Sequence, residues 1–132
     1  MSFARAVFYI EAVLINLGVG LICFFFPGWF VRQIIEQAPG PLPLELTRWY
    51  GVLLFVLAYG MLRALATGSQ TAVTVMVEAL LVGDLAHLAA SIFFFQAGGP
   101  VNVGTILMVS FSTFLAGVRA FWLIQTRKNS DG

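Results

Sequence analysis

Charged residues and cysteine are both scarce in this chain of 132 residues. Asp, Glu, Lys and Arg make up 10% of it, against about 25% in an average soluble domain, and hydrophobic residues make up 60%, against about 45–50%. A soluble domain of this length leaves much of its surface in water, where an apolar cover is unfavourable. The shortage of charge therefore excludes an ordinary water-soluble domain and favours the lipid bilayer as the solvent.

The small number of basic residues excludes a second class of protein. The net charge is +1 at pH 7, and the seven Lys and Arg residues are scattered rather than gathered into the basic face that nucleic acids require. The single cysteine, Cys23, excludes an internal disulfide and fits a small buried hydrophobe. One histidine falls short of the usual metal ligand sets, so we expect no metal and no cofactor.

Long apolar segments are what the chain has in abundance. A hydrocarbon core of about 30 Å needs roughly 20 apolar residues in a helix. Four segments qualify, approximately Phe3 to Phe26, Leu44 to Ala66, Thr71 to Phe95 and Val101 to Gln125. Short Gly- and Pro-containing breaks separate them, and short connections place sequence neighbours antiparallel. The prediction is an all-α integral membrane protein, an up-down-up-down four-helix bundle that forms a single domain over residues 1–132.

Two features of the N-terminal half refine this prediction. Glu11 interrupts the first segment and no small-residue cleavage motif follows before Pro27, so we expect a retained membrane helix rather than a signal peptide. Residues 28–38, GWFVRQIIEQA, have the pattern of a short helix that lies in the membrane interface, or of a lid over a substrate. The PGPLP that follows is expected to form a stiff elbow.

The distribution of Lys and Arg predicts the orientation of the spans. Arg5, Arg63, Arg127 and Lys128 belong to one side of the membrane, and fewer basic residues belong to the other. Because cytoplasmic loops carry the excess of basic residues, both termini are predicted to be cytoplasmic.

Ionisable residues inside the spans are costly and are functional candidates by default. Counted at about 1.5 Å per residue, Glu11 and Glu78 lie at nearly one level, about 12 and 10 Å from the cytoplasmic edge, and Arg119 can reach toward that level. Asp84 and His87 lie roughly 20 and 24 Å from that edge. With Asn16 and Arg48 they are expected to form a second polar layer.

Helical spacing places several of these residues on shared faces. Asp84, His87 and Ser91 form one stripe, and Thr105, Ser112 and Arg119 form another at intervals of seven. A hydrolase triad is not expected from the Asp, His and Ser of one helix, since a single helix does not orient nucleophile, base and oxyanion hole together.

Proton transfer is the chemistry that these residues favour. Hydrocarbon disfavours the charged form of a carboxyl group, so Glu11, Glu78 and Asp84 are the candidate acids and His87 is the candidate base or relay. Aromatic faces can stabilise a cation away from water. The residues expected to bind substrate are Asn16, Arg48, Trp49, Tyr59, Ser112 and Arg119. The hypothesis is an enzyme that isomerises or cyclises a terpenoid or sterol-like molecule.

Other interpretations of the same residues stay open. A carboxylate paired with Arg119 can simply fix helix register, which suits a non-catalytic subunit of a membrane complex or a lipid-binding module. Two polar layers joined through Tyr59 and Ser112 would suit a proton or ion pathway. The glycines of the spans are expected to mark close helix contacts: Gly18, Gly20, Gly51, Gly60, Gly83 and Gly117. Four helices enclose little volume, so a homo-oligomer with a pocket between protomers is an additional expectation.

Four motifs carry a resemblance to known proteins: FYIEAVLINLGVG, FFFPGWF, GDLAH and GVRAFWL. Through them the chain resembles a group of small four-span membrane proteins, mainly fungal. The resemblance implies that Glu11, Asp84, His87 and Arg119 belong to a shared pattern. The chain is more distantly similar to membrane isomerases of the emopamil-binding type and to membrane terpene cyclases, which have more spans and place acidic residues inside an apolar bundle.

Overall fold

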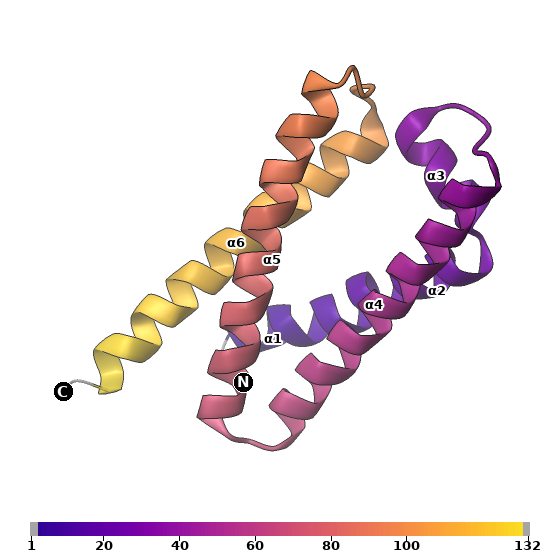
Figure 1. Cartoon of the computed structure of the whole chain (residues 1–132). Helices are drawn as coiled ribbons and strands as arrows, with labels where there is room; N and C mark the ends of the chain where they lie inside the picture. Colours follow the sequence, from indigo (N-terminus) through magenta and orange to yellow (C-terminus); the bar gives the residue numbers. More distant parts are fainter. Residues whose placement is uncertain (1–2, 131–132) are drawn as a thin grey trace. The chain divides into compact units, whose positions relative to one another are not determined.

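The structure is a computed structural model that describes residues 3–130, with side chains up to Lys128 (Figure 1). Its elements are α1 (Phe3–Ile10), the π-helix η1 (Glu11–Leu17), α2 (Gly18–Phe25), α3 (Pro27–Ile35), α4 (Pro41–Ala66), α5 (Gln70–Gln96) and α6 (Val103–Ser130). The described residues contain no strand, so the predicted all-α class is confirmed. Four helices are long and apolar enough to cross a membrane: Phe3–Phe25, Pro41–Ala66, Gln70–Gln96 and Val103–Lys128.

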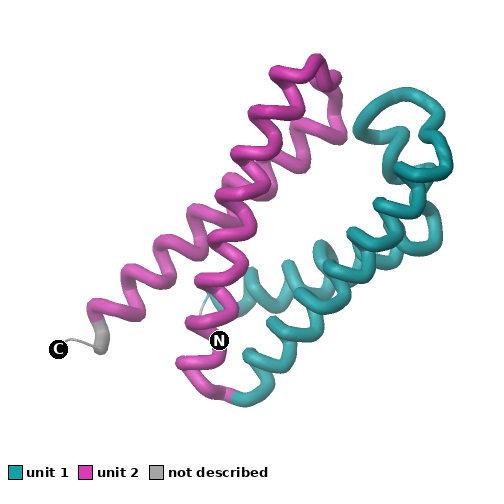
Figure 2. Tube along the Cα trace, viewed as in Figure 1, with its two compact units in different colours: residues 1–67 teal, residues 68–132 magenta. Residues whose placement is uncertain are grey.

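The chain divides into two compact units, residues 1–67 and 68–132 (Figure 2). Unit 1 holds the first span, α3 and α4, and unit 2 holds α5 and α6. Within each unit the two spanning helices run antiparallel (Figure 1). The single domain expected over residues 1–132 stays a prediction.

Two glycines bring the spanning helices of unit 1 close together. A Cβ added at Gly51 would lie 2.8 Å from the backbone oxygen of Gly20 and 3.1 Å from Cβ of Cys23. A Cβ added at Gly20 would lie 3.2 Å from the backbone oxygen of Gly51. The two backbones therefore touch at a point that only glycine permits, as is common between membrane helices. The close contact predicted for these two glycines is confirmed.

Prolines begin two helices of unit 1. Pro27 opens α3 directly after Phe26, and Pro41 opens α4 after the extended Gly40. Proline suits the first turn of a helix, where its missing N–H has no intrahelical acceptor in any case. The stiff elbow expected for PGPLP is therefore wrong in part, because its last three residues are the first turn of α4. The short helix expected after the first span is present as α3, where Val31 is buried and the Phe30 ring lies 6.5 Å from that of Tyr50.

Unit 2 is a helical hairpin with a capped turn. The backbone N–H of Gly98, at φ 86°, donates to the carbonyl oxygen of Phe95 and ends α5. α6 then starts with a reciprocal cap, in which Thr105 N–H donates to Asn102 Oδ1 and Asn102 N–H donates to Thr105 Oγ1, both at 3.0 Å. This short connection makes α5 and α6 antiparallel, as predicted.

Candidate functional site

The polar side chains of unit 2 meet along the line where α5 and α6 pack. We call Asp84, His87, Ser112 and Arg119 the polar seam. Arg119 Nη1 donates to Asp84 Oδ2 and also to the backbone oxygen of Leu80, at 3.2 Å in the second case. The Arg119 residue is only 1% exposed, and Asp84 is partly buried. A guanidinium in this position is stabilised by the carboxylate and by a carbonyl that already belongs to a helix.

Side-chain direction explains why Arg119 finds Asp84. Side chains on a helix tilt toward its N-terminus. In an antiparallel pair, an arginine on α6 and an aspartate on α5 therefore lean toward each other from opposite directions. A count of Cα depths placed Arg119 near the level of Glu11 and Glu78, whereas within unit 2 Arg119 pairs with Asp84, and Glu78 pairs with Arg127.

His87 and Ser112 form the second contact of the polar seam. His87 Nδ1 and Ser112 Oγ are 2.6 Å apart, across the same helix pair. Ser112 is buried and His87 is partly buried. The two predicted stripes thus face each other, with one ion pair and one hydroxyl–imidazole hydrogen bond between them.

The other two hydroxyls of the stripes, those of Ser91 and Thr105, form hydrogen bonds with backbone atoms. Ser91 Oγ donates to the carbonyl oxygen of His87, four residues earlier on α5. Thr105 caps α6, as described above, and is buried like Ser112 and Arg119. The residues at i, i+7 spacing on α6 therefore form a buried face. The first of them, Thr105, caps the start of the helix and does not contact the polar seam.

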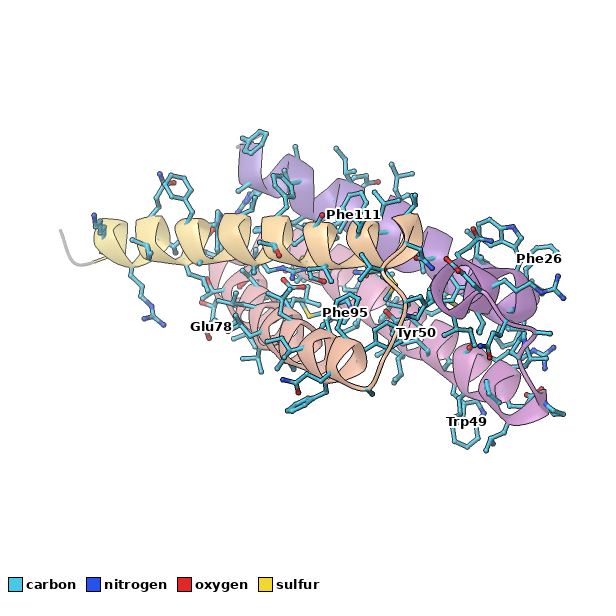
Figure 3. The ribbon with its side chains drawn as sticks, turned by 90° about the horizontal axis from the view of Figure 1, so that it is seen from above. Phe26, Trp49, Tyr50, Glu78, Phe95 and Phe111 are labelled. Atoms are coloured by element: carbon cyan, nitrogen blue, oxygen red, sulfur yellow. The ribbon has the colours of Figure 1, made fainter. Side chains whose placement is uncertain are left out.

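Glu78 lies apart from the polar seam, six residues before Asp84 on α5. Glu78, labelled in Figure 3, pairs with Arg127 Nη2 at 3.2 Å. Both side chains are substantially exposed. Arg127 is therefore the counter-ion of Glu78, although the sequence indicated it only as one of the basic residues on the cytoplasmic side. Glu78 is therefore a member of an exposed ion pair and is not a buried acid.

The buried carboxyl of unit 1 is Glu11, the first residue of η1. Glu11 is 2% exposed, and its Oε1 accepts a hydrogen bond at 3.4 Å from Nδ2 of Asn16, which is 6% exposed. These residues are five positions apart, so a regular α-helix would turn them away from each other. The π-helix adds one residue to the turn and brings i and i+5 onto one face.

Apolar composition gave no signal for this π-helix. Its backbone register depends on hydrogen bonds to the fifth residue, which the hydrophobic pattern does not reveal. π-helical turns inside α-helices occur frequently at functional sites, which marks η1 as a second candidate region beside the polar seam.

Three other predicted substrate-binding residues lie outside both groups. Arg48 pairs with Glu45, three positions earlier on α4, and both side chains are exposed to solvent or lipid by more than a third. Trp49 and Tyr59 are each 68% exposed, and Trp49 projects outward from α4 (Figure 3). The i, i+3 spacing of Glu45 and Arg48 was the available signal for their pairing. The predicted layer of Arg48 with Asp84 and His87, which belong to unit 2, stays a prediction.

In the part of the chain that the structure describes, no three His, Cys, Asp or Glu residues lie close enough together to bind a metal ion. The polar seam offers instead an imidazole, a hydroxyl and an ion pair, and η1 offers a carboxyl and an amide. Comparison of the chain with protein-family models, with curated proteins and with solved structures finds no match.

Proposed function

We propose that the chain is a small integral membrane enzyme that transfers a proton to or from a hydrophobic, terpenoid or sterol-like substrate, which is isomerised or cyclised as a result. The observation that carries the proposal is the imidazole of His87, held within a span by the 2.6 Å contact of its Nδ1 with Ser112 Oγ. Histidine is the side chain best suited to proton transfer near neutral pH. Since Nδ1 is occupied, the substrate would meet Nε2.

The neighbouring residues receive separate roles in this proposal. Asp84 and Arg119 form an ion pair, so the pair is assigned the role of orienting the polar seam and supplying a fixed dipole, and the role of acid is not assigned to Asp84. Glu11, buried and hydrogen-bonded by Asn16, is the carboxyl group that handles a proton in unit 1. Glu78 is left out of the chemistry, because its carboxylate is already paired with Arg127 and lies apart from the polar seam.

Deuterium uptake tests the proposal without knowledge of the substrate. Membranes that contain the protein are incubated in D2O with the non-saponifiable lipid extract of the host, and the lipids are analysed by mass spectrometry. Protonation at carbon leaves one solvent deuteron in the product, so one component gains deuterium only when the protein is present. His87→Gln lowers this rate by about 10²–10⁴-fold, the usual contribution of a general acid or base.

The matched control is Thr113→Ala, on the neighbouring position of α6. Thr113 is exposed and its hydroxyl donates only to the carbonyl oxygen of Val109, so uptake is expected to be unchanged. If no lipid gains deuterium beyond the level of membranes without the protein, the enzymatic proposal is wrong.

A non-catalytic role, as a subunit of a membrane complex or a lipid-binding module, is the second candidate. The observation that favours it is the pairing of α5 with α6 by two ion pairs, Asp84–Arg119 and Glu78–Arg127, which fixes the register of the hairpin. A stoichiometric partner that co-purifies with the wild type and is lost from Asp84→Asn, while no lipid takes up deuterium, would support this role.

A further inference from the structure

The hydrogen-bond partners of Ser112 carry information about the protonation of His87. Ser and Thr hydroxyls inside helices usually donate to a carbonyl oxygen one turn earlier. In this chain Thr47, Ser91 and Thr113 all do so, to the residue four positions back. Among the described residues, Ser112 Oγ instead has one hydrogen-bond partner, Nδ1 of His87.

A buried hydroxyl has one proton to donate, and leaving it without an acceptor costs about 1–3 kcal/mol. Because Ser112 is buried and Nδ1 is its one partner, the serine proton points at Nδ1. Nδ1 then accepts, and an accepting nitrogen bears no proton of its own. The neutral ring must carry its proton on Nε2.

We propose that Ser112 is a positioning residue that selects the Nε2–H tautomer of His87, and that the resting protein presents this N–H as a hydrogen-bond donor to an oxygen atom of the substrate. The substrate is then an oxygenated terpenoid or sterol-like molecule, a ketone or an alcohol, rather than a plain hydrocarbon. A neutral imidazole N–H that binds a carbonyl oxygen polarises it and favours proton loss at the neighbouring carbon. This substrate class depends on the proposed function, whereas the tautomer does not.

The charged groups near this ring are already engaged. Asp84, one turn before His87 on α5, is held by Arg119 of α6, so neither needs the imidazole as its counter-ion. Among the described residues of unit 2, the Ser112 hydroxyl is the group whose hydrogen bond sets the ring. His87 Nε2 has no hydrogen bond in the described part of the chain, which leaves that nitrogen available to a ligand.

Nitrogen NMR tests the tautomer directly, because His87 is the one histidine in the chain. The full chain is labelled with 15N-histidine, placed in lipid nanodiscs at pH 8, and recorded by long-range 1H–15N correlation. The expected spectrum shows a protonated Nε2 and an unprotonated Nδ1. An Nδ1–H tautomer in the wild type would overturn the inference.

Three variants separate positioning from a merely structural role. Ser112→Ala lowers the ratio of Nε2–H to Nδ1–H tautomer by about fivefold, the equivalent of one ordinary hydrogen bond. Ser112→Thr, which keeps the hydroxyl, restores the wild-type ratio, and Thr113→Ala leaves it unchanged. An unchanged ratio in Ser112→Ala would contradict the assignment, and so would a failure of Ser112→Thr to restore it.

Two probes test the substrate class in the same sample. Geranylacetone, an isoprenoid ketone, is expected to shift the Nε2–H signal, and the hydrocarbon β-farnesene is not. Equal shifts, or no shift with the ketone, would overturn the oxygenated substrate class. A wild-type Nε2–H tautomer in a protein that promotes no deuterium uptake would preserve the role of Ser112 and refute the proposed function, so the two failures are distinguishable.

Discussion

Arg119 and Asp84 are 35 positions apart in the sequence and form an ion pair between α6 and α5, with the arginine side chain almost entirely removed from solvent. The same guanidinium donates to the carbonyl oxygen of Leu80. One side chain therefore ties two consecutive turns of α5 to α6. The pair therefore fixes the register of α5 against α6 at this point of unit 2.

Breaking this ion pair is expected to destabilise the protein strongly. Asp84→Ala leaves a buried guanidinium without its carboxylate, and removing one partner of a buried pair costs about 3–5 kcal/mol. The double variant Asp84→Ala/Arg119→Leu removes both charges and recovers most of that loss. The free energy of unfolding, measured by urea titration in detergent micelles, checks both expectations.

The matched control for this experiment is Glu78→Gln, which removes the acid of the exposed pair with Arg127. Exposed pairs contribute about 0–1 kcal/mol, so the free energy of unfolding changes little. Equal losses for Asp84→Ala and Glu78→Gln would mean that burial does not distinguish the two pairs.

The glycine contact of unit 1 predicts a position-specific effect of one methyl group. Gly51→Ala would press a Cβ against the backbone of Gly20, which cannot rotate away, so we expect a loss of about 1–3 kcal/mol in the free energy of unfolding. Gly83→Ala places the same methyl where, apart from the adjacent backbone of α5, no atom of the described residues lies within 4 Å. There the higher helix propensity of alanine makes the change neutral or stabilising, by up to about 1 kcal/mol. Thermal unfolding of the two variants checks the contrast, and a stable Gly51→Ala protein would contradict the close contact.

The predicted orientation of the spans has a chemical test. Cys23 is the one cysteine of the sequence, so a Cys23→Ala background has no thiol that reacts with maleimides, and single new cysteines can be introduced into it. In intact cells, a membrane-impermeant maleimide is expected to label Gln37→Cys and Ala97→Cys, which follow the first and third spans, and to leave Thr67→Cys unlabelled. Labelling of Thr67→Cys alone would reverse the orientation.

The sequence was sufficient to predict the spanning helices, because about twenty apolar residues in a row have few alternatives to a membrane helix. The predicted bounds and those of the structure differ by a few residues, as for α4, which begins at Pro41 rather than Leu44. Helix starts are uncertain where proline is involved, since the residue that prevents a helix interior also favours a first turn. Gly83 and Gly117 were expected to mark helix contacts, but no atom of another described helix lies within 4 Å of a Cβ added at either position. Small size permits a close approach but does not require one.

The sequence predicted which polar residues share a helix face, but it did not predict which residues pair with one another across the helices. Helical spacing correctly placed Asp84 with His87, and Ser112 with Arg119, on two stripes. The partners depend on the length and tilt of side chains and on local register, which a count of Cα depths omits. For the same reason the approach of Asn16 to Glu11 could not be predicted, because it depends on the π-helix.

The proposed chemistry depends on buried side chains that exchange protons, and Glu11→Gln removes one of these groups. The amide oxygen of glutamine can still accept the hydrogen bond from Asn16, but glutamine has no acidic proton to transfer. The rate of deuterium uptake is measured for wild type and variant at a temperature at which both are folded by circular dichroism. The rate is expected to fall by about 10²-fold or more in the variant. A folded Glu11→Gln protein that takes up deuterium at the wild-type rate would contradict the proposed chemistry.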